Sequence, residues 1–312
     1  MVYCFDIGGS FIKFGVPDAA GLVTESGRVP TPLNSFDELV EVLVSSIRSM
    51  PASFAPLVSI SLAGIINPNS QLTSVANIPC LNDRRLKGDL EKKLGLPVVI
   101  SNDADCFALA EARLGAGRGH TNVFCIILGS GVGGGMVFNG DLLSGFGGFG
   151  GEWGHGPSVD PGAGGLIEPL KRMRCACGGV GCLDTVGGAR GLERLHWAIH
   201  AEQAGSTDII ARWLNGESEA ALSVKVLVEH VSRALSVVVN TFGASIVPVG
   251  GGLSHSVELV SLIDRRVRAL TLADYVQPLV VPGKHAQDGG LIGAALAGED
   301  LRQALSGKEL AE

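Results

Sequence analysis

The chain has 312 residues, of which 46% are hydrophobic and 18% charged, and this composition excludes a disordered protein. Its 24 lysine and arginine residues against 31 aspartate and glutamate residues give a net charge of −7, which argues against a nucleic-acid-binding protein. No run of 18 apolar residues is present, so no membrane helix is expected. A length of this order predicts about two domains.

The N-terminal part predicts strands and helices that alternate. MVYCFDIGGS has neither the basic segment nor the long apolar segment of a signal peptide, so we expect it to form the first strand of the fold. Ser35 and Glu38 form a capping box for a helix that ends before Pro51. The other elements expected here are strands at 2–7, 11–16, 21–29, 57–62 and 97–100, and helices at 89–94 and from Asn102 to about residue 114.

The C-terminal part repeats this pattern. A strand that runs into glycines occurs near residues 8, 129 and 250, and two βββαβα-like halves would produce that spacing. We place the lobe boundary in the glycine-rich turn 115–121, which gives an N-terminal lobe 1–118, joined by a C-terminal helix 288–312, and a C-terminal lobe 119–287. Expected elements are strands 122–128 and 136–138 joined by a glycine run, helices 192–203, 207–215 and 218–242, strand 245–249, a helix opened by Gly250–Gly252, and helix 289–297.

Cysteine and glycine are both distributed unevenly. Seven cysteines are an odd number for a disulfide framework, which favours a reducing compartment and predicts a cytoplasmic protein. Four of them lie in apolar segments and are expected in the core. Of 45 glycines, 22 lie between Gly129 and Gly191. Because glycine lets the backbone approach a ligand closely, we expect the functional centre in that stretch.

Two glycine-rich segments are candidate phosphate sites. In the first, a strand delivers Asp6 to a Gly8-Gly9 turn followed by Ser10 and Lys13. Backbone N–H groups of such a turn suit phosphate oxygens, and a carboxylate there can hold Mg²⁺. An ordinary hairpin is the alternative. The second segment comprises Gly129-Ser130-Gly131-Val132-Gly133-Gly134-Gly135.

The second segment contains G-x-G-x-x-G, but a strand and the turn Asn139-Gly140 follow it in place of a helix. This context excludes a dinucleotide-binding motif. We interpret it as a hairpin whose backbone amides face nucleotide phosphates, with a flexible turn as the alternative. A third candidate is Asp103, where an apolar strand ends and a helix begins. A carboxylate at that position can be a helix cap or a general base.

A Cys/His set gives the most specific signal. Glu152-Trp153-Gly154-His155 is followed by three cysteines within eight residues, Cys175, Cys177 and Cys182. Three thiolates and one imidazole are the ligands of a closed structural zinc site. An iron–sulfur cluster normally takes four cysteines, and glycines around Glu152 argue against the helix that a di-iron site needs.

These segments, in this order, resemble the ROK family of sugar kinases and repressors from Asp6 to about residue 295. The resemblance implies an α/β, two-lobed actin/hexokinase-like (ribonuclease H-like) fold with a Cys3His zinc loop. Within the family the chain looks most like the members that phosphorylate N-acetylglucosamine. The features that carry this are Phe5–Gly9, Asn102–Leu109 and the long segment between His155 and Cys175.

The resemblance implies roles for matching positions. Asp103 would take the proton from the sugar 6-hydroxyl while ATP and Mg²⁺ supply the phosphoryl group, and zinc would be structural. A homodimer is implied as well. Sugar contacts are implied for Gly64, Asn77, Asn102, Asp103, Glu152, His155 and Asp184. Contacts to the nucleotide are implied for Asp6, Gly8, Gly9, Ser10, Lys13, Gly131, Val132, Gly133, Gly134 and Gly135, with Gly250–Gly252, and Gly251 in particular, near the adenosine end.

Some positions depart from the family pattern. Ser10 and Ser130 replace threonines and keep a hydroxyl, and Ala176 replaces a glycine. Asp184 stands where a glutamate usually contacts the sugar, and Ala63 replaces a proline. The last two changes leave other hexoses open as substrates, namely glucose, N-acetylmannosamine and fructose. A sugar-responsive repressor is disfavoured, because Asp6 begins the kinase motif where a repressor has a DNA-binding segment.

Overall fold

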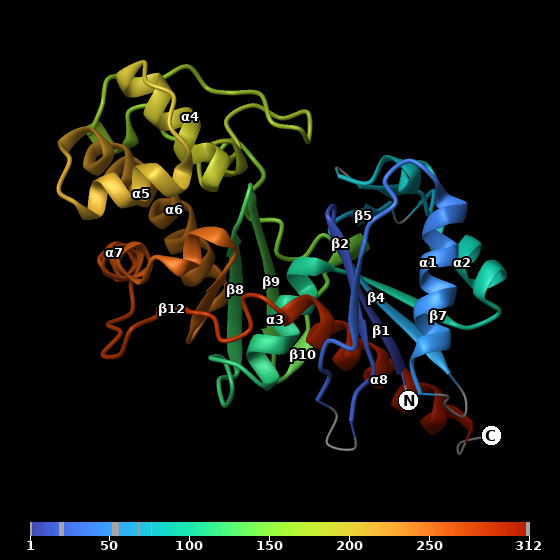
Figure 1. The fold of residues 1–312 in the computed structure, drawn as a ribbon. Helices are drawn as coiled ribbons and strands as arrows, with labels where there is room; N and C mark the ends of the chain where they lie inside the picture. The colour runs from blue at the N-terminus through green and yellow to red at the C-terminus, as the bar shows by residue number, and fades with distance from the viewer. Residues whose placement is uncertain (1, 19–21, 52–55, 68, 76, 310–312) are drawn as a thin grey trace. The chain divides into compact units, whose positions relative to one another are not determined.

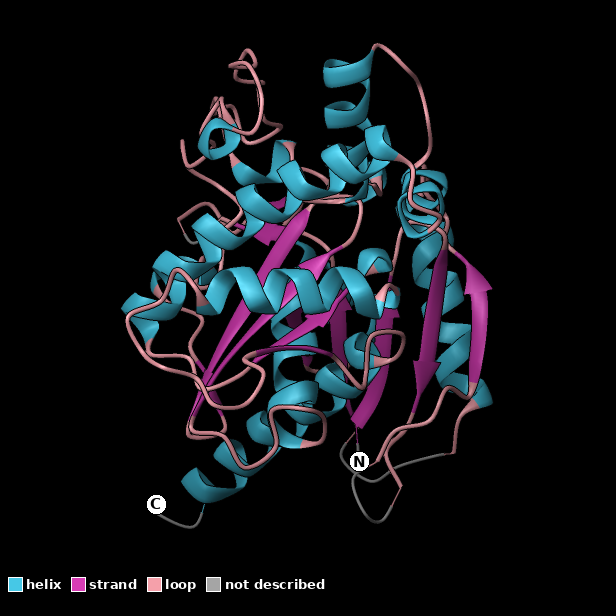
Figure 2. Ribbon diagram, turned by 90° about the vertical axis from the view of Figure 1, so that its left-hand side faces the viewer, coloured by secondary structure: helices cyan, strands magenta, loops and turns pink. Residues whose placement is uncertain are grey.

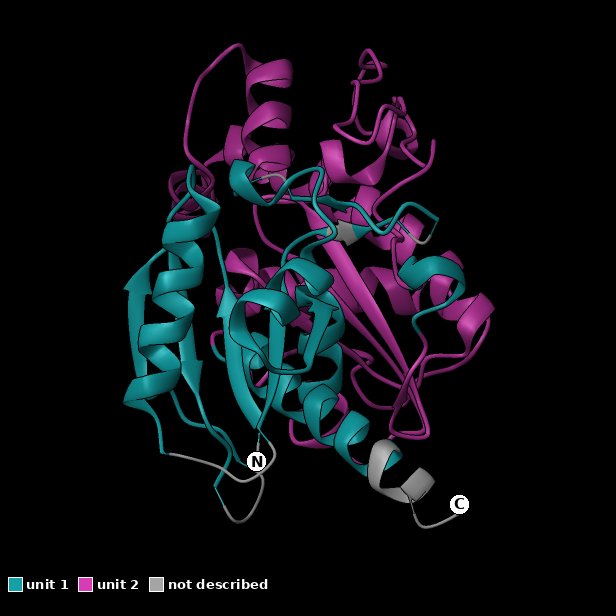
Figure 3. Cartoon of the chain, turned by 90° about the vertical axis from the view of Figure 1, so that its right-hand side faces the viewer, with its two compact units in different colours: residues 1–110, 144–150, 288–312 teal, residues 111–143, 151–287 magenta. Residues whose placement is uncertain are grey.

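The computed structural model describes residues 2–18, 22–51, 56–67, 69–75 and 77–309. The chain forms two compact units (Figure 3). Unit 1 comprises residues 1–110, 144–150 and 288–312, and unit 2 comprises residues 111–143 and 151–287. The first boundary falls inside helix α3 (Asp103–Arg113), ahead of the glycine-rich turn at 115–121. Each unit contains its own five-stranded sheet, and both sheets can be followed in Figure 2.

The sheet of unit 1 has the strand order β3-β2-β1-β4-β7. Its strands are β1 (Val2–Ile7), β2 (Phe11–Gly15), β3 (Gly27–Pro30), β4 (Leu57–Leu62) and β7 (Val98–Asn102). β1 pairs antiparallel with β2 and parallel with β4, and β4 pairs parallel with β7. Asp6 is in register with Ser61, and Ser61 with Ser101. The carboxyl ends of three parallel strands therefore meet at one edge, where α/β sheets bind ligands.

Successive side chains of β1 point to opposite faces of this sheet. Tyr3 and Phe5 join the core with α1 (Phe36–Ser49), whose N-cap Ser35 accepts a hydrogen bond from the Glu38 amide, as the sequence predicts. α2 (Leu86–Leu94) lies on the same side, and α8 (Gly289–Glu309) lies on the opposite side (Figure 1). α8 approaches β1 and β4 closely, since a Cβ on Gly298 would lie 2.6 Å from Val2.

The sheet of unit 2 repeats the same topology, with the order β10-β9-β8-β11-β12. Its strands are β8 (Asn122–Leu128), β9 (Val132–Phe138), β10 (Asp141–Leu142), β11 (Val247–Gly250) and β12 (Val280–Pro282). β8 pairs antiparallel with β9 and parallel with β11. In both units an antiparallel meander of three strands is extended by two parallel strands, which confirms the two similar halves expected from the sequence.

Four helices build the core of unit 2 with this sheet. They are α4 (Ala189–His200), α5 (Ser206–Leu214), α6 (Ser218–Phe242) and α7 (Val257–Arg268). α6 has the predicted bounds and buries Leu227, Val231 and Leu235. The short elements of the chain are β5 (Ile65–Ile66), β6 (Thr73–Ser74), η1 (Pro79–Leu81), η2 (Phe146–Gly148), η3 (Ala163–Gly165), η4 (Leu183–Thr185) and η5 (Gly252–His255).

Several expectations on element bounds were wrong. The helix expected at 192–203 is α4, three residues earlier at each end. Residue 21 of the expected strand 21–29 lies outside the described residues, and β3 covers only Gly27–Pro30. The helix expected at 289–297 continues to Glu309. In its additional part, Glu299 and Arg302 form a salt bridge one helical turn apart. The glycines expected to join two strands lie inside β9, where Gly133, Gly134 and Gly135 pair with β8. In the described part of the chain, no helix has an apolar stretch long enough to cross a bilayer.

Candidate functional site

In unit 1, the predicted acid Asp6 lies on β1 within a polar cluster at the carboxyl edge of the sheet. The Ser61 hydroxyl donates to Asp6 Oδ1 at 2.9 Å, and Lys13 Nζ lies 3.7 Å from Asp6 Oδ2. Burial raises the pKa of the Asp6 carboxyl, although the Ser61 hydrogen bond and the Lys13 charge lower it. Mg²⁺ commonly binds one or two carboxylates and keeps water or phosphate as its other ligands. Asp6 fits that donor set.

Asn102 and Asp103 stand where β7 passes into α3. Asn102 Oδ1 accepts a hydrogen bond from the Ala104 amide at 2.8 Å, and Asp103 Oδ1 accepts one from the same amide at 3.0 Å. Asn102 Nδ2 donates to the Gly64 carbonyl at 3.1 Å, which ties the turn after β4 to the end of β7. The structure therefore brings together three of the predicted sugar residues, namely Gly64, Asn102 and Asp103, at one edge of unit 1.

The turn between β1 and β2 is tight and crowded. The Gly8 amide donates to the Phe11 carbonyl at 3.0 Å, and the Thr31 hydroxyl donates to the Gly8 carbonyl at 2.6 Å. A Cβ on Gly9 would lie 2.9 Å from Asn77 Cβ, so the predicted sugar residue Asn77 packs against the predicted phosphate turn. Ser10 is exposed at its tip.

Gly290 in the first turn of α8 lies directly against Asp6. A Cβ at this position would lie 2.4 Å from Asp6 Oδ1. We expect Gly290→Ala to displace the carboxylate and to lower the free energy of unfolding by about 1–3 kcal/mol. Gly88→Ala in α2 is the matched control, because nothing lies within 4 Å of its Cβ, and it should gain about 0.5–1 kcal/mol. Urea unfolding of the two variants checks both; equal stabilities would contradict the close approach.

In unit 2, the glycine-rich hairpin β8–β9 is held by specific contacts. The Ala189 amide, at the start of α4, donates to the Gly129 carbonyl at 2.7 Å, and Trp153 Nε1 donates to the Gly133 carbonyl at 2.8 Å. The Val132 amide donates to Asp184 Oδ1 at 2.9 Å. The Val132 amide, expected to face a phosphate, is thus already engaged.

The glycines of β9 also make room for the segment that carries Glu152 and His155. A Cβ on Gly134 would lie 2.7 Å from Trp153, and a Cβ on Gly154 would lie 2.7 Å from the Val132 carbonyl oxygen. The glycines therefore allow side-chain and backbone atoms of neighbouring segments to pack closely on the backbone in this unit. Trp153 was not singled out from the sequence, because its partner lies 20 residues away and no local pattern marks that pair.

The predicted metal ligands converge in unit 2. One ligand atom from each of His155, Cys175, Cys177 and Cys182 lies within 4.8 Å of all the others. Cys177 Sγ and Cys182 Sγ are 3.7 Å apart, and His155 Nδ1 is 3.6 Å from Cys175 Sγ. Zinc–sulfur bonds of ~2.3 Å in a tetrahedron place two sulfurs ~3.8 Å apart. The four side chains therefore fit Zn²⁺.

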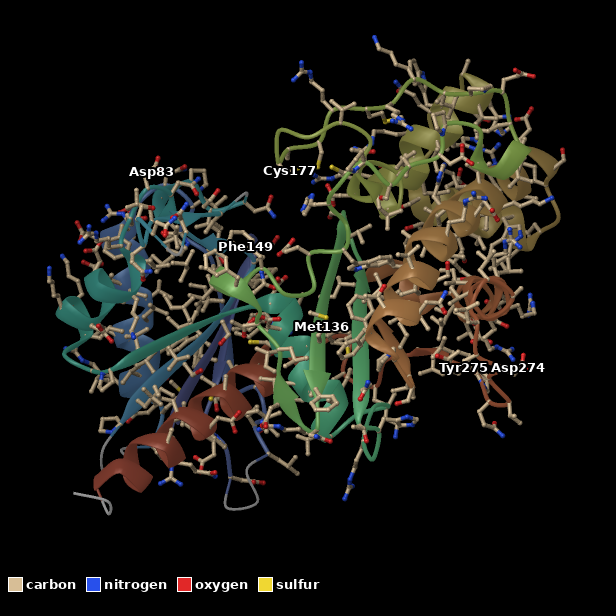
Figure 4. All side chains as sticks on the ribbon, turned by 180° about the vertical axis from the view of Figure 1, so that it is seen from behind. Asp83, Met136, Phe149, Cys177, Asp274 and Tyr275 are labelled. Atoms are coloured by element: carbon tan, nitrogen blue, oxygen red, sulfur yellow. The ribbon has the colours of Figure 1, made fainter. Side chains whose placement is uncertain are left out.

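The surroundings of this Cys3His cluster differ from one ligand to the next. Burial raises the pKa of the Cys175 thiol to about 12, whereas a hydrogen bond from the Gly179 backbone lowers the pKa of Cys177 to about 7. Cys177 is exposed on its loop (Figure 4). His155 Nε2 lies 3.6 Å from Glu152 Oε2, the carboxylate–histidine arrangement that often orients a zinc ligand. Burial raises the pKa of Glu152.

Unit 2 also contains a cavity of about 410 Å³ beside the turn after β11. Gly251 in this turn has a φ of 82°, and its Cβ would lie 2.5 Å from the Leu128 backbone, so only glycine fits. The walls come from three separate segments, and the family resemblance pointed only to the one around Gly252. The lining comprises Ala189, Ser206, Thr207, Ile210, Leu214, Gly252, Leu253, His255, Ser256 and Glu258.

The chain is similar to known ROK-family proteins over nearly its whole length. Residues 2–300 match the model of the ROK family. The chain is 34% identical to the N-acetyl-D-glucosamine kinase of Photobacterium profundum, over 95% of this chain and 98% of that protein. It is similar to the crystal structure of the ROK hexokinase from Thermus thermophilus, with a TM-score of 0.83, 26% identity, and 97% and 99% of the two chains covered. A ROK family glucokinase from Streptomyces griseus, in complex with glucose and AMPPNP, has a TM-score of 0.75, 27% identity, and 96% and 99% coverage.

Proposed function

The chain belongs to the ROK family, and on this basis we propose that it transfers the terminal phosphoryl group of ATP to the 6-hydroxyl of N-acetyl-D-glucosamine. One observation carries the proposal. Asp103 follows the last residue of β7, at the carboxyl edge where β1 presents Asp6, in a chain whose relative with 34% identity is an N-acetyl-D-glucosamine kinase.

Unit 1 would supply the base and part of the sugar site. We assign Asp103 as the general base that accepts the proton of the 6-hydroxyl as the oxygen attacks phosphorus. The Asn102 side chain holds both the Ala104 amide and the Gly64 carbonyl, and this fixes the start of α3 and therefore the Asp103 backbone. Asn102, Gly64 and Asn77 would contact the sugar hydroxyls. In unit 2, Glu152 and His155 would do so.

Backbone amides and one cavity support binding of the nucleotide. We assign the Gly8–Ser10 turn with Lys13 in unit 1, and the glycines Gly131 and Gly133–Gly135 in unit 2, to the phosphates, since phosphoryl transfer depends on positioning and charge stabilisation. The Val132 amide is left out of this set because it binds Asp184. Bound by Asp6, Mg²⁺ would neutralise charge on the phosphates. The cavity beside Gly252 combines the apolar Ile210 and Leu253 with hydroxyl side chains, which suits the base and ribose of an adenosine.

Zinc would have a structural role beside the sugar residues of unit 2. His155 would bind it through Nδ1, which faces Cys175, while Nε2 faces Glu152. We also propose a reducing, cytoplasmic location, because none of the seven cysteines forms a disulfide in the described residues and three of them are needed as thiolates. A homodimer is proposed from the family resemblance alone.

An ADP-release assay across a panel of hexoses and N-acetylhexosamines tests the substrate. We expect kcat/KM for N-acetyl-D-glucosamine to exceed that for glucose, N-acetylmannosamine and fructose by about 10–200-fold, the range over which one small group discriminates. The 6-deoxy analogue should give no sugar-dependent ADP, and NMR should locate the phosphate on the 6-oxygen. A higher kcat/KM for another hexose would replace the proposed substrate, and ADP release without sugar would reject the kinase function.

A further inference from the structure

Asp184, which stands where the family resemblance implies a sugar-binding glutamate, is surrounded by protein groups. We propose that Asp184 is a positioning residue, which fixes the start of β9 against the segment that carries Glu152 and His155, and that its carboxylate does not bind the sugar. This inference rests on the proposed function, since it concerns which residues of unit 2 meet the substrate.

The first observation concerns Asp184 Oδ1. It accepts a hydrogen bond from the Val132 amide at 2.9 Å, at the first residue of β9. A Cβ on Gly131 would lie only 2.2 Å from this oxygen, so the oxygen is pressed against the backbone of the turn. It is directed into the hairpin and is occupied there.

The second observation concerns the rest of Asp184. Its backbone amide donates to the Gly154 carbonyl at 2.9 Å, and Gly154 itself packs on the Val132 carbonyl. Asp184 Oδ2 lies 3.7 Å from Cys175 Sγ. One residue therefore contacts the glycine hairpin, the Glu152–His155 segment and a ligand of the Cys3His cluster, and both carboxylate oxygens face protein groups.

These contacts depend on the length of the Asp184 side chain. The Asp184 Oδ1 atom occupies the space where a Cβ on Gly131 would lie. A glutamate carries its carboxylate one methylene further along the side chain, so we expect it to lose the 2.9 Å contact that Asp184 Oδ1 makes with the Val132 amide. An asparagine would keep the Oδ1 acceptor for Val132, and its Nδ2 can donate to the sulfur of Cys175.

Three variants separate positioning from sugar binding. In Asp184→Ala, we expect faster hydrogen exchange at the Val132 amide, faster loss of zinc to a chelator, and a KM for ATP raised about tenfold, the effect of one lost hydrogen bond. The KM for N-acetyl-D-glucosamine should change less than about twofold. Asp184→Asn should rescue the protection of Val132 and the retention of zinc, and Asp184→Glu should resemble the alanine variant. Asp141→Ala, which removes an exposed carboxylate of the same unit, is the control.

The opposite results would overturn the inference. If Asp184→Asn raises the sugar KM tenfold or more while Val132 stays protected, the carboxylate binds the sugar. Unchanged exchange at Val132 in Asp184→Ala shows that the contact does not position β9. These exchange measurements need no substrate. They decide the role of Asp184 even if the wild-type protein shows no sugar-dependent ADP release, a result that would reject the proposed function alone.

Discussion

Asp103→Asn is expected to lower kcat by about 10²–10⁴-fold, the usual contribution of a general base. The amide matches the carboxylate in size and can still accept the hydrogen bond that Asp103 Oδ1 receives from the Ala104 amide, so α3 should begin at the same residue. It cannot take up the proton of the sugar hydroxyl. The KM values for sugar and ATP should change much less than kcat, since the lost interaction belongs to the transition state.

The measurement is steady-state ADP release at saturating sugar and ATP. Zinc content and thermal unfolding of Asp103→Asn should match those of the wild type, because the Cys3His cluster belongs to unit 2. Asp37→Asn is the control, since Asp37 is an exposed acid in the first turn of α1, and it should retain full turnover. If Asp103→Asn keeps more than about a tenth of wild-type kcat, another group must accept the proton.

Local sequence patterns predicted the elements whose stability is local. The Ser35–Glu38 capping box marked the start of α1, and the bounds expected for the helix at 218–242 agree with those of α6. The repeated strand–glycine pattern predicted the duplicated sheet, because register and strand order follow from the same βββαβα unit in each half. The four ligands of the Cys3His cluster were predicted because a zinc site requires particular residue types, and three of the four lie within eight residues.

Contacts between distant segments could not be predicted in this way. The hydroxyl that binds Asp6 belongs to Ser61, which lies 55 residues away along the chain. β9 begins inside a glycine run that resembles a loop, since the groups that pack on those glycines come from 151–154 and from Asp184. The cavity beside Gly252 draws its walls from three segments. In each case the role of a glycine or serine depends on a residue far away in the sequence, so the local sequence does not predict it.

Removal of zinc is expected to have the second large effect. With Cys182→Ser, or after chelation of the wild type, kcat/KM should fall by about 10–100-fold, as changes around metal ligands commonly do. Cys182 is buried and immediately precedes η4, which carries Asp184. Without the metal, thiolate and imidazole groups lose the ion that holds them together, so His155, a proposed sugar ligand, loses its fixed orientation.

The rest of unit 2 should remain folded in the zinc-free protein, because most of its core is built by α4, α5, α6, α7 and the sheet. Far-UV circular dichroism should change little, while hydrogen exchange should rise from residue 155 to residue 184, and added zinc should restore activity to the chelated wild type but not to Cys182→Ser. Cys80→Ser is the control, since Cys80 lies in unit 1 outside the cluster. If protein shown to contain no zinc keeps full activity, the Cys3His cluster is not required for sugar binding. The proposal that zinc orients His155 would then be wrong.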